Sequence, residues 1–197
     1  AGDSSFSVGG NVYVKAYAGG GDLGAAKDTN SMSNAPEDGG SGSGARWKYR
    51  YGTEDVQSSA SKGIALNDTS LIPYYKTFGN KGGANTINYV AAGGGGATKA
   101  GGNTCVTNVT TALGKKDERY AGAGGEGLKS LITGTAVVYG SGGGGGSGIA
   151  DYKTDKQSTT EIYLGTGKGA LGGTGAGNGN QTVGGAGTSA KPNQGGG

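Results

Sequence analysis

The chain of 197 residues contains 49 glycines and only three prolines, and its net charge is +3. Scarce proline excludes collagen, and scattered basic residues do not form the basic face that nucleic-acid binding requires. With no histidine and a single cysteine, Cys105, the sequence excludes a Ser-His-Asp triad, the usual zinc sites and an internal disulfide. No apolar run is long enough to span a membrane, so we expect no membrane insertion.

Four stretches share one design, in which a short segment rich in Val, Ile, Tyr and Thr precedes a run of glycines. They are Asn11–Gly21, Thr86–Gly96, Thr133–Gly146 and Thr159–Gly173. The β-branched and aromatic parts predict strands. In the first copy Val12, Val14 and Ala16 alternate with Tyr13, Lys15 and Tyr17, which is the period of a strand.

The recurrence of glycine behind similar strands indicates that the missing Cβ is needed, because glycine lets main chains approach closely. An extended three-fold helix has no internal hydrogen bonds, so its main-chain groups must pair laterally with neighbours. We therefore predict a mostly β/irregular fold of short strands and packed polyglycine II helices, a glycine-rich sandwich with very little α-helix. The alternative is that the glycine runs are disordered linkers.

The first candidate binding strand is "RWKYRY", Arg46 to Tyr51. In an extended strand Trp47, Tyr49 and Tyr51 share one face, and Arg46, Lys48 and Arg50 share the other. Interleaved aromatic and basic residues suit sugar stacking, anionic surfaces or single-stranded nucleic acid. The alternative is an edge strand whose aromatic residues are buried in a small core.

The second candidate set is the charged stretch "KKDERY", which lies between glycine motifs and which we predict to be an exposed tip. Its candidate receptor-binding residues are Lys115, Lys116, Arg119 and Tyr120. The alternative is a charged surface that is merely solvated.

Catalytic chemistry has little support in the sequence, since the carboxylates are dispersed as Glu37–Asp38, Glu54–Asp55 and Asp117–Glu118. The stretch "GTGKGALGG", Gly165 to Gly173, fails the spacing of a phosphate-binding loop, and we predict that it is a glycine-helix segment. We therefore predict no enzyme activity, no metal and no cofactor.

Residues Gly122 to Gly148, "GAGGEGLKSLITGTAVVYGSGGGGGSG", resemble the glycine-rich domain of phage tail-fibre tip adhesins and bacterial surface proteins. Ala1–Gly21 and Gly172–Gly197 resemble two further phrases of that family. The resemblance implies a sandwich of polyglycine II helices whose intervening loops contact the host receptor. The segment 22–84 departs from the family's short loops, and we expect an elaborated binding loop or a subdomain there.

We therefore expect a single glycine-rich domain, 1–197, that is a piece of a longer chain. Its expected function is a non-enzymatic adhesin module on the virion surface, as a tail fibre, or at the cell surface. Its expected partners are a host cell-surface protein or glycan and other fibre, virion or filament subunits. We also expect it to form a homo-oligomer or part of a larger assembly, and not to bind nucleic acid.

The alternative function is a structural subunit of an extracellular filament or matrix, in which strand edges pair between chains. A third reading, ice binding, would require a regular array of threonines or small residues, and the sequence has clusters instead.

Overall fold

The computed structural model describes residues 4–16, 41–45, 78–86, 90–111, 114–147, 165–168, 171–179, 187–192 and 194. The candidate strand Arg46–Tyr51 lies outside the described residues. The described part contains strands and irregular extended segments and no α-helix, which confirms the mostly β/irregular class.

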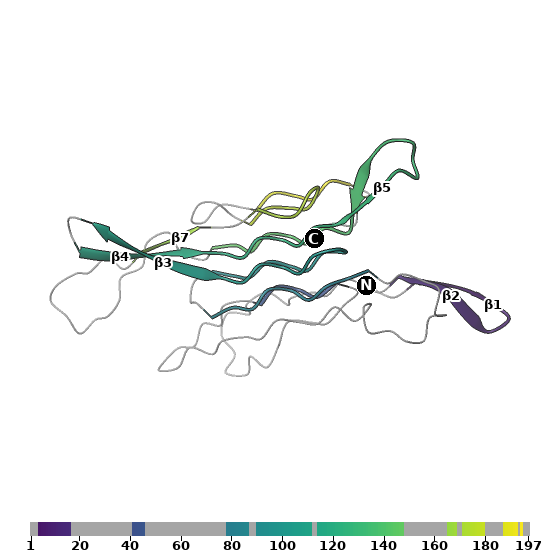
Figure 1. Cartoon of the computed structure of the whole chain (residues 1–197), viewed down its shortest axis with the longest axis horizontal. Coiled ribbons are helices and arrows are strands. Elements are labelled where there is room, and N and C mark those ends of the chain that lie inside the picture. The colour runs from purple at the N-terminus through teal and green to yellow at the C-terminus, as the bar shows by residue number, and fades with distance from the viewer. Residues whose placement is uncertain are drawn as a thin grey trace.

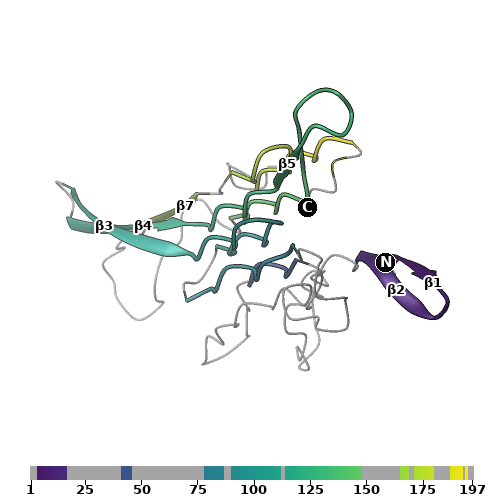
Figure 2. The ribbon, with the colours of Figure 1, turned by 45° about the vertical axis from the view of Figure 1, so that its right-hand side comes forward.

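Seven short strands form three small sheets. The strands are β1 (Ser4–Val8), β2 (Asn11–Ala16), β3 (Cys105–Thr111), β4 (Gly114–Tyr120), β5 (Leu128–Ser130), β6 (Val137–Tyr139) and β7 (Gly165–Lys168). β1 pairs with β2 and β5 with β6, both antiparallel, while β4 lies between β3 (antiparallel) and β7 (parallel). Figures 1 and 2 show the β3–β4–β7 sheet at one end of the molecule and the two hairpins at the other.

Between the sheets, extended glycine-rich segments run side by side (Figure 1). The main-chain N–H and C=O groups of each segment form hydrogen bonds with neighbouring segments. The N–H groups of the central segment, 90–97, donate in three directions, each repeated every three residues. In the first direction Ala91, Gly94 and Ala97 donate to the carbonyls of Gly146, Gly143 and Gly140. In the second, Ala92 and Gly95 donate to those of Ala45 and Gly42. In the third, Gly93 and Gly96 donate to those of Gly102 and Lys99, and all seven bonds are 2.7–3.0 Å long.

The same segment accepts hydrogen bonds from two further segments, again at three-residue spacing. Asn80 and Gly83 of segment 78–86 donate to Gly96 and Gly93, and Gly122 and Gly125 of segment 121–127 donate to Ala91 and Gly94. Segment 90–97 is therefore bonded to five others: 41–45, 78–86, 98–104, 121–127 and 140–147. The described glycine runs are bonded parts of the fold and are not linkers.

Glycine is required at most of these positions by close contact. A Cβ on Gly93 would come within 3.0 Å of the carbonyl oxygen of Ala123, and one on Gly145 would meet that of Ala91 equally closely. Gly94 is different, because its Cβ would come no closer than 3.4 Å to any described atom, the nearest being Gly143 N. Two adjacent glycines in one run thus have different steric requirements.

The described residues bury few side chains. Their buried hydrophobic residues are Ala45, Val90, Ala92 and Ala121, and only Val90 among them is large. Buried polar contacts support the end of the bundle next to β3: Asn85 Nδ2 donates to Val90 O (2.6 Å), and Thr104 Oγ1 donates to Asn85 Oδ1 (3.1 Å). The core of the described part is therefore built mainly of hydrogen-bonded main chain.

The predicted strands of the first and third copies are confirmed, whereas residues 87–89 of the second copy and 159–164 of the fourth lie outside the described residues. β2 and β6 fall where the first and third copies predict strands. In the second copy Thr86 is outside any strand and Val90 forms only an isolated bridge with Ser147. In the fourth copy the prediction of a glycine-helix segment is wrong at Gly165–Lys168, because β7 forms there by pairing with β4.

Two described parts of the long segment 22–84 contribute to the bundle. Gly42 N and Ala45 N donate to Asn80 O and Gly83 O, both at 2.9 Å. Residues 41–45 and 78–84 are therefore parts of the glycine bundle.

Candidate binding surfaces

The charged stretch predicted as an exposed tip is a strand. Lys115, Lys116 and Arg119 lie in β4, the central strand of the β3–β4–β7 sheet, so they belong to a strand and not to a loop. The cause is pairing with β3 along the whole strand, where Lys116 lies opposite Val109, and with β7 from Asp117 to Tyr120, where Arg119 lies opposite both Val106 and Gly167. The run of charged side chains did not prevent a strand, because the main chain bonds to neighbouring strands.

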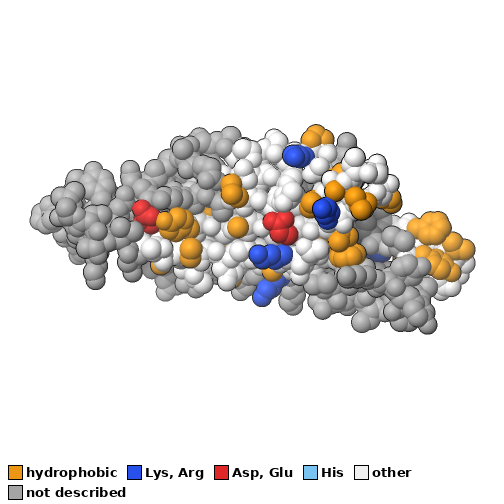
Figure 3. Space-filling view, turned by 45° about the horizontal axis from the view of Figure 1, so that its top comes forward, with side chains coloured by type: hydrophobic (Ala, Val, Ile, Leu, Met, Phe, Trp, Pro, Cys, Tyr) orange, Lys and Arg blue, Asp and Glu red, His pale blue; other side chains and the backbone are white. Residues whose placement is uncertain are grey.

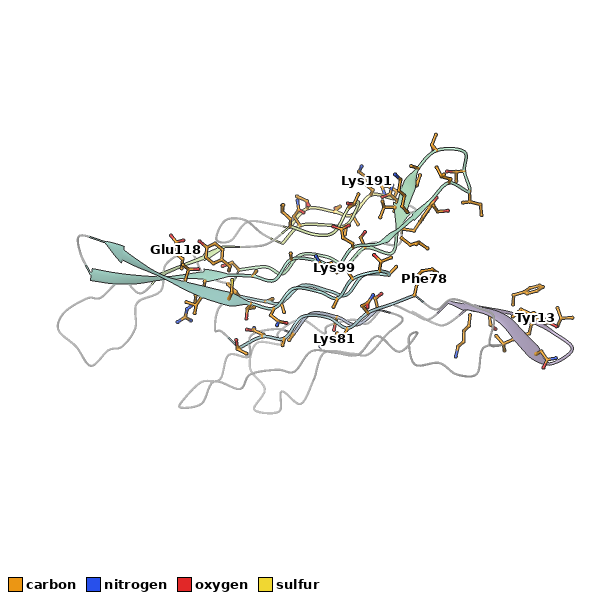
Figure 4. All side chains as sticks on the ribbon, viewed as in Figure 1. Tyr13, Phe78, Lys81, Lys99, Glu118 and Lys191 are labelled. Atoms are coloured by element: carbon orange, nitrogen blue, oxygen red, sulfur yellow. The ribbon has the colours of Figure 1, made fainter. Side chains whose placement is uncertain are left out.

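Tyr120 is held at the end of β4. Its hydroxyl donates a hydrogen bond to Glu118 Oε2, and both side chains are half-buried. Figure 4 shows Glu118 at the β4 end of the molecule, far from the β5–β6 hairpin. A contribution of Lys115, Lys116, Arg119 and Tyr120 to receptor binding stays a prediction, and it would have to come from a sheet surface.

The most exposed apolar side chains lie instead on the β5–β6 hairpin. In its connecting turn Leu131 is 68% exposed and Ile132 is 88% exposed. The turn itself is ordered by a hydrogen bond from Gly134 N to Leu131 O (2.9 Å), with Gly134 at φ +82°. Adjacent Leu and Ile side chains are therefore presented to solvent on a defined turn.

The β1–β2 hairpin also exposes apolar side chains. Gly9 and Gly10, both with positive φ, form its turn, as two-residue hairpins require. Phe6 is 61% exposed, and its ring lies 6.3 Å from that of Tyr13. Figure 3 shows hydrophobic side chains on this hairpin and nearby at the same end of the molecule.

The sequence analysis did not predict the apolar turn, because the third copy begins at Thr133 and leaves Leu131 and Ile132 outside it. The available signal was Thr133-Gly134 between two short apolar runs, which is typical of a hairpin with a loop of several residues. Both hairpins therefore offer apolar side chains for contact with another molecule.

In the part of the chain that the structure describes, no three His, Cys, Asp or Glu side chains gather as metal ligands, and no helix is long and apolar enough to cross a bilayer. Cys105 is exposed on β3 as a free thiol. Comparison with family models, curated proteins and solved structures finds no match for this chain.

Proposed function

We propose that this protein is a non-enzymatic adhesin module of the phage tail-fibre type, in which a glycine bundle presents hairpins to a host cell surface. We infer that the bundled segments are polyglycine II helices. The support is their bonding, since N–H groups that donate in three directions with a three-residue repeat are what a three-fold extended chain provides.

The observation that carries the proposal is the exposure of Leu131 and Ile132 on an ordered turn at one end of the bundle. Two adjacent large apolar side chains gain little from burial while most of their surface faces water. On a binding surface, however, such side chains supply the central apolar contacts. A frame made of hydrogen-bonded main chain holds that turn in place, so little order has to be gained on binding.

The function is tested with fluorescently labelled protein on a panel of bacterial cells, with the size of the same sample measured in parallel. Saturable binding to a narrow set of strains is expected. The variant Leu131→Ser/Ile132→Ser should bind about 10- to 100-fold more weakly, the loss typical of interface hot spots. The control Thr133→Ser changes the same turn, keeps a hydroxyl and should bind normally.

Equal binding by both variants would place the receptor site elsewhere. The variant Trp47→Ala/Tyr49→Ala then tests the aromatic candidate strand, and a folded variant that loses binding would assign the site to it.

A second candidate function is a subunit of an extracellular filament. One observation favours it: β3 and β7 are the outer strands of their described sheet, and Val106 on β3 is 46% exposed. An outer strand is suited to pairing with another chain. Growth into filaments under dilute native conditions, together with no binding to cells, would favour this function over adhesion.

A further inference from the structure

The five neighbours of segment 90–97 follow one another around it. Segment 41–45 is bonded to 78–86 (Gly42 N to Asn80 O), and 78–86 is bonded to 98–104 (Gly101 N to Lys81 O). Segment 98–104 is bonded in turn to 121–127 (Gly102 N to Ala123 O), and 121–127 is bonded to 140–147 (Gly142 N to Gly125 O). A three-fold chain has three donor and three acceptor directions, hence six neighbouring positions. The sixth lies between 140–147 and 41–45, and we name it the open flank.

Main-chain groups on the open flank repeat every three residues. The carbonyls of Ala92 and Gly95 face it from the central segment, and the N–H groups of Gly143 and Gly146 face it from segment 140–147. None of these four groups bonds to a described residue. Exposure agrees with this assignment, because Ala91, Gly94 and Ala97 are half-buried, whereas residues 92, 93, 95 and 96 are buried.

The steric contacts of the central glycines identify the same flank. A Cβ on Gly93, Gly95 or Gly96 would strike a carbonyl oxygen of a neighbouring segment, namely that of Ala123, Asn80 or Glu126. A Cβ on Gly94 strikes none. By the three-residue repeat, Ala91 and Ala97 lie on the same line of the segment as Gly94, so their methyl groups point toward the open flank.

A glycine chain placed there at the spacing of the other neighbours would meet two methyl groups, six residues apart, with its carbonyls, whereas segment 78–86 meets only the single methyl of Ala92. We propose that the methyl groups of Ala91 and Ala97 close the open flank to a further glycine chain, and so prevent lateral assembly through a glycine segment of a second copy. Side chains on the edge strand of a β-sheet prevent another chain from pairing with that strand in a comparable way.

The test uses a labelled peptide with the sequence of Gly140–Ser147, GSGGGGGS, and the variant Ala91→Gly/Ala97→Gly. The wild-type protein should not bind the peptide. The variant should bind it at least about tenfold more tightly, the effect of one or two added main-chain hydrogen bonds. At high concentration the variant should also form larger species by light scattering.

Two variants separate this effect from a general gain of glycine. Ala92→Gly removes an adjacent buried methyl that faces segment 78–86, where a Cβ on Gly83 would lie 3.1 Å from it, and the substitution should not create peptide binding. Adding Gly94→Ala to the double variant restores a methyl on the open flank and should abolish the binding. Equal peptide binding by wild type and double variant would overturn the proposal.

Amide hydrogen exchange in the wild-type protein gives a test that does not depend on folding of a variant. Within one glycine run, the amides of Gly142, Gly144 and Gly145 donate to described carbonyls and should exchange slowly. Those of Gly143 and Gly146 should exchange quickly. Protection of these two amides would mean that other residues of the chain or a second copy already fill the flank, and it would overturn the proposal.

Discussion

Substitution of two adjacent glycines, Gly93→Ala and Gly94→Ala, should have opposite effects on stability. A methyl at position 93 would come within 3.0 Å of the carbonyl oxygens of Ala123 and Gly122. Because these are main-chain atoms in a bonded segment, 121–127 would have to move as a unit. A methyl at position 94 lies 3.4 Å from its nearest described atom, so nothing has to move.

The cost at position 93 follows from the hydrogen bonds that this movement breaks. Segment 121–127 is tied to its neighbours by bonds from Gly122 N to Ala91 O (3.0 Å), Gly125 N to Gly94 O (2.8 Å) and Gly102 N to Ala123 O (2.7 Å). Three net hydrogen bonds at about 0.5–1.5 kcal/mol each amount to about 1.5–4.5 kcal/mol. The lower entropy of the unfolded alanine chain offsets about 0.4–1 kcal/mol.

We therefore expect Gly93→Ala to lower the free energy of unfolding by about 0.5–4 kcal/mol. Gly94→Ala should raise it by about 0.4–1 kcal/mol, because only the entropy of the unfolded chain changes. Urea denaturation followed by circular dichroism measures both. Equal destabilisation by the two variants, or a neutral Gly93→Ala, would refute the assignment of close main-chain packing to this segment.

Three further substitutions test other contacts. Asn80→Ala should lower stability by about 1–3 kcal/mol, because the amide Nδ2 donates to two carbonyls of the central segment at 2.9 and 3.1 Å; denaturation beside the exposed control Lys81→Ala measures this. Gly10→Ala, at φ +82° with nothing within 4 Å of its Cβ, carries a purely backbone cost of about 1–2 kcal/mol, and weaker NOEs across the β1–β2 hairpin should report it. Tyr120→Phe removes the hydroxyl donated to Glu118 and should lower stability by about 0.5–1.5 kcal/mol in the same denaturation assay; an unchanged midpoint would show that the bond does not contribute.

The sequence predicted the kind of fold better than its details. Strands β2 and β6 follow from local pattern, because alternating β-branched and aromatic residues prefer a pleated surface whatever lies beside them. The role of the glycine runs followed from their recurrence, and the bonds of segments 90–97 and 140–147 bear out their predicted lateral pairing.

The failures concern pairing between segments distant in sequence. β4 reads as a solvated charged stretch and β7 as part of a glycine run, and each is a strand only because a partner lies beside it. The apolar turn at Leu131 and Ile132 was missed for a different reason. Hydrophobicity indicates burial on average, and exposure of two adjacent apolar residues depends on where the hairpin projects.

The bonds between neighbouring segments also permit either relative chain direction. Segments 41–45 and 78–86 run parallel, since Gly42 and Ala45 donate to Asn80 and Gly83, whereas 78–86 and 90–97 run antiparallel, since Asn80 and Gly83 donate to Gly96 and Gly93. A chain leaving one segment can therefore return at the same end or the opposite end, after a connection of any length. Longer connections add little entropic cost, so such a frame can exchange its connecting loops freely while the glycine spacing stays unchanged.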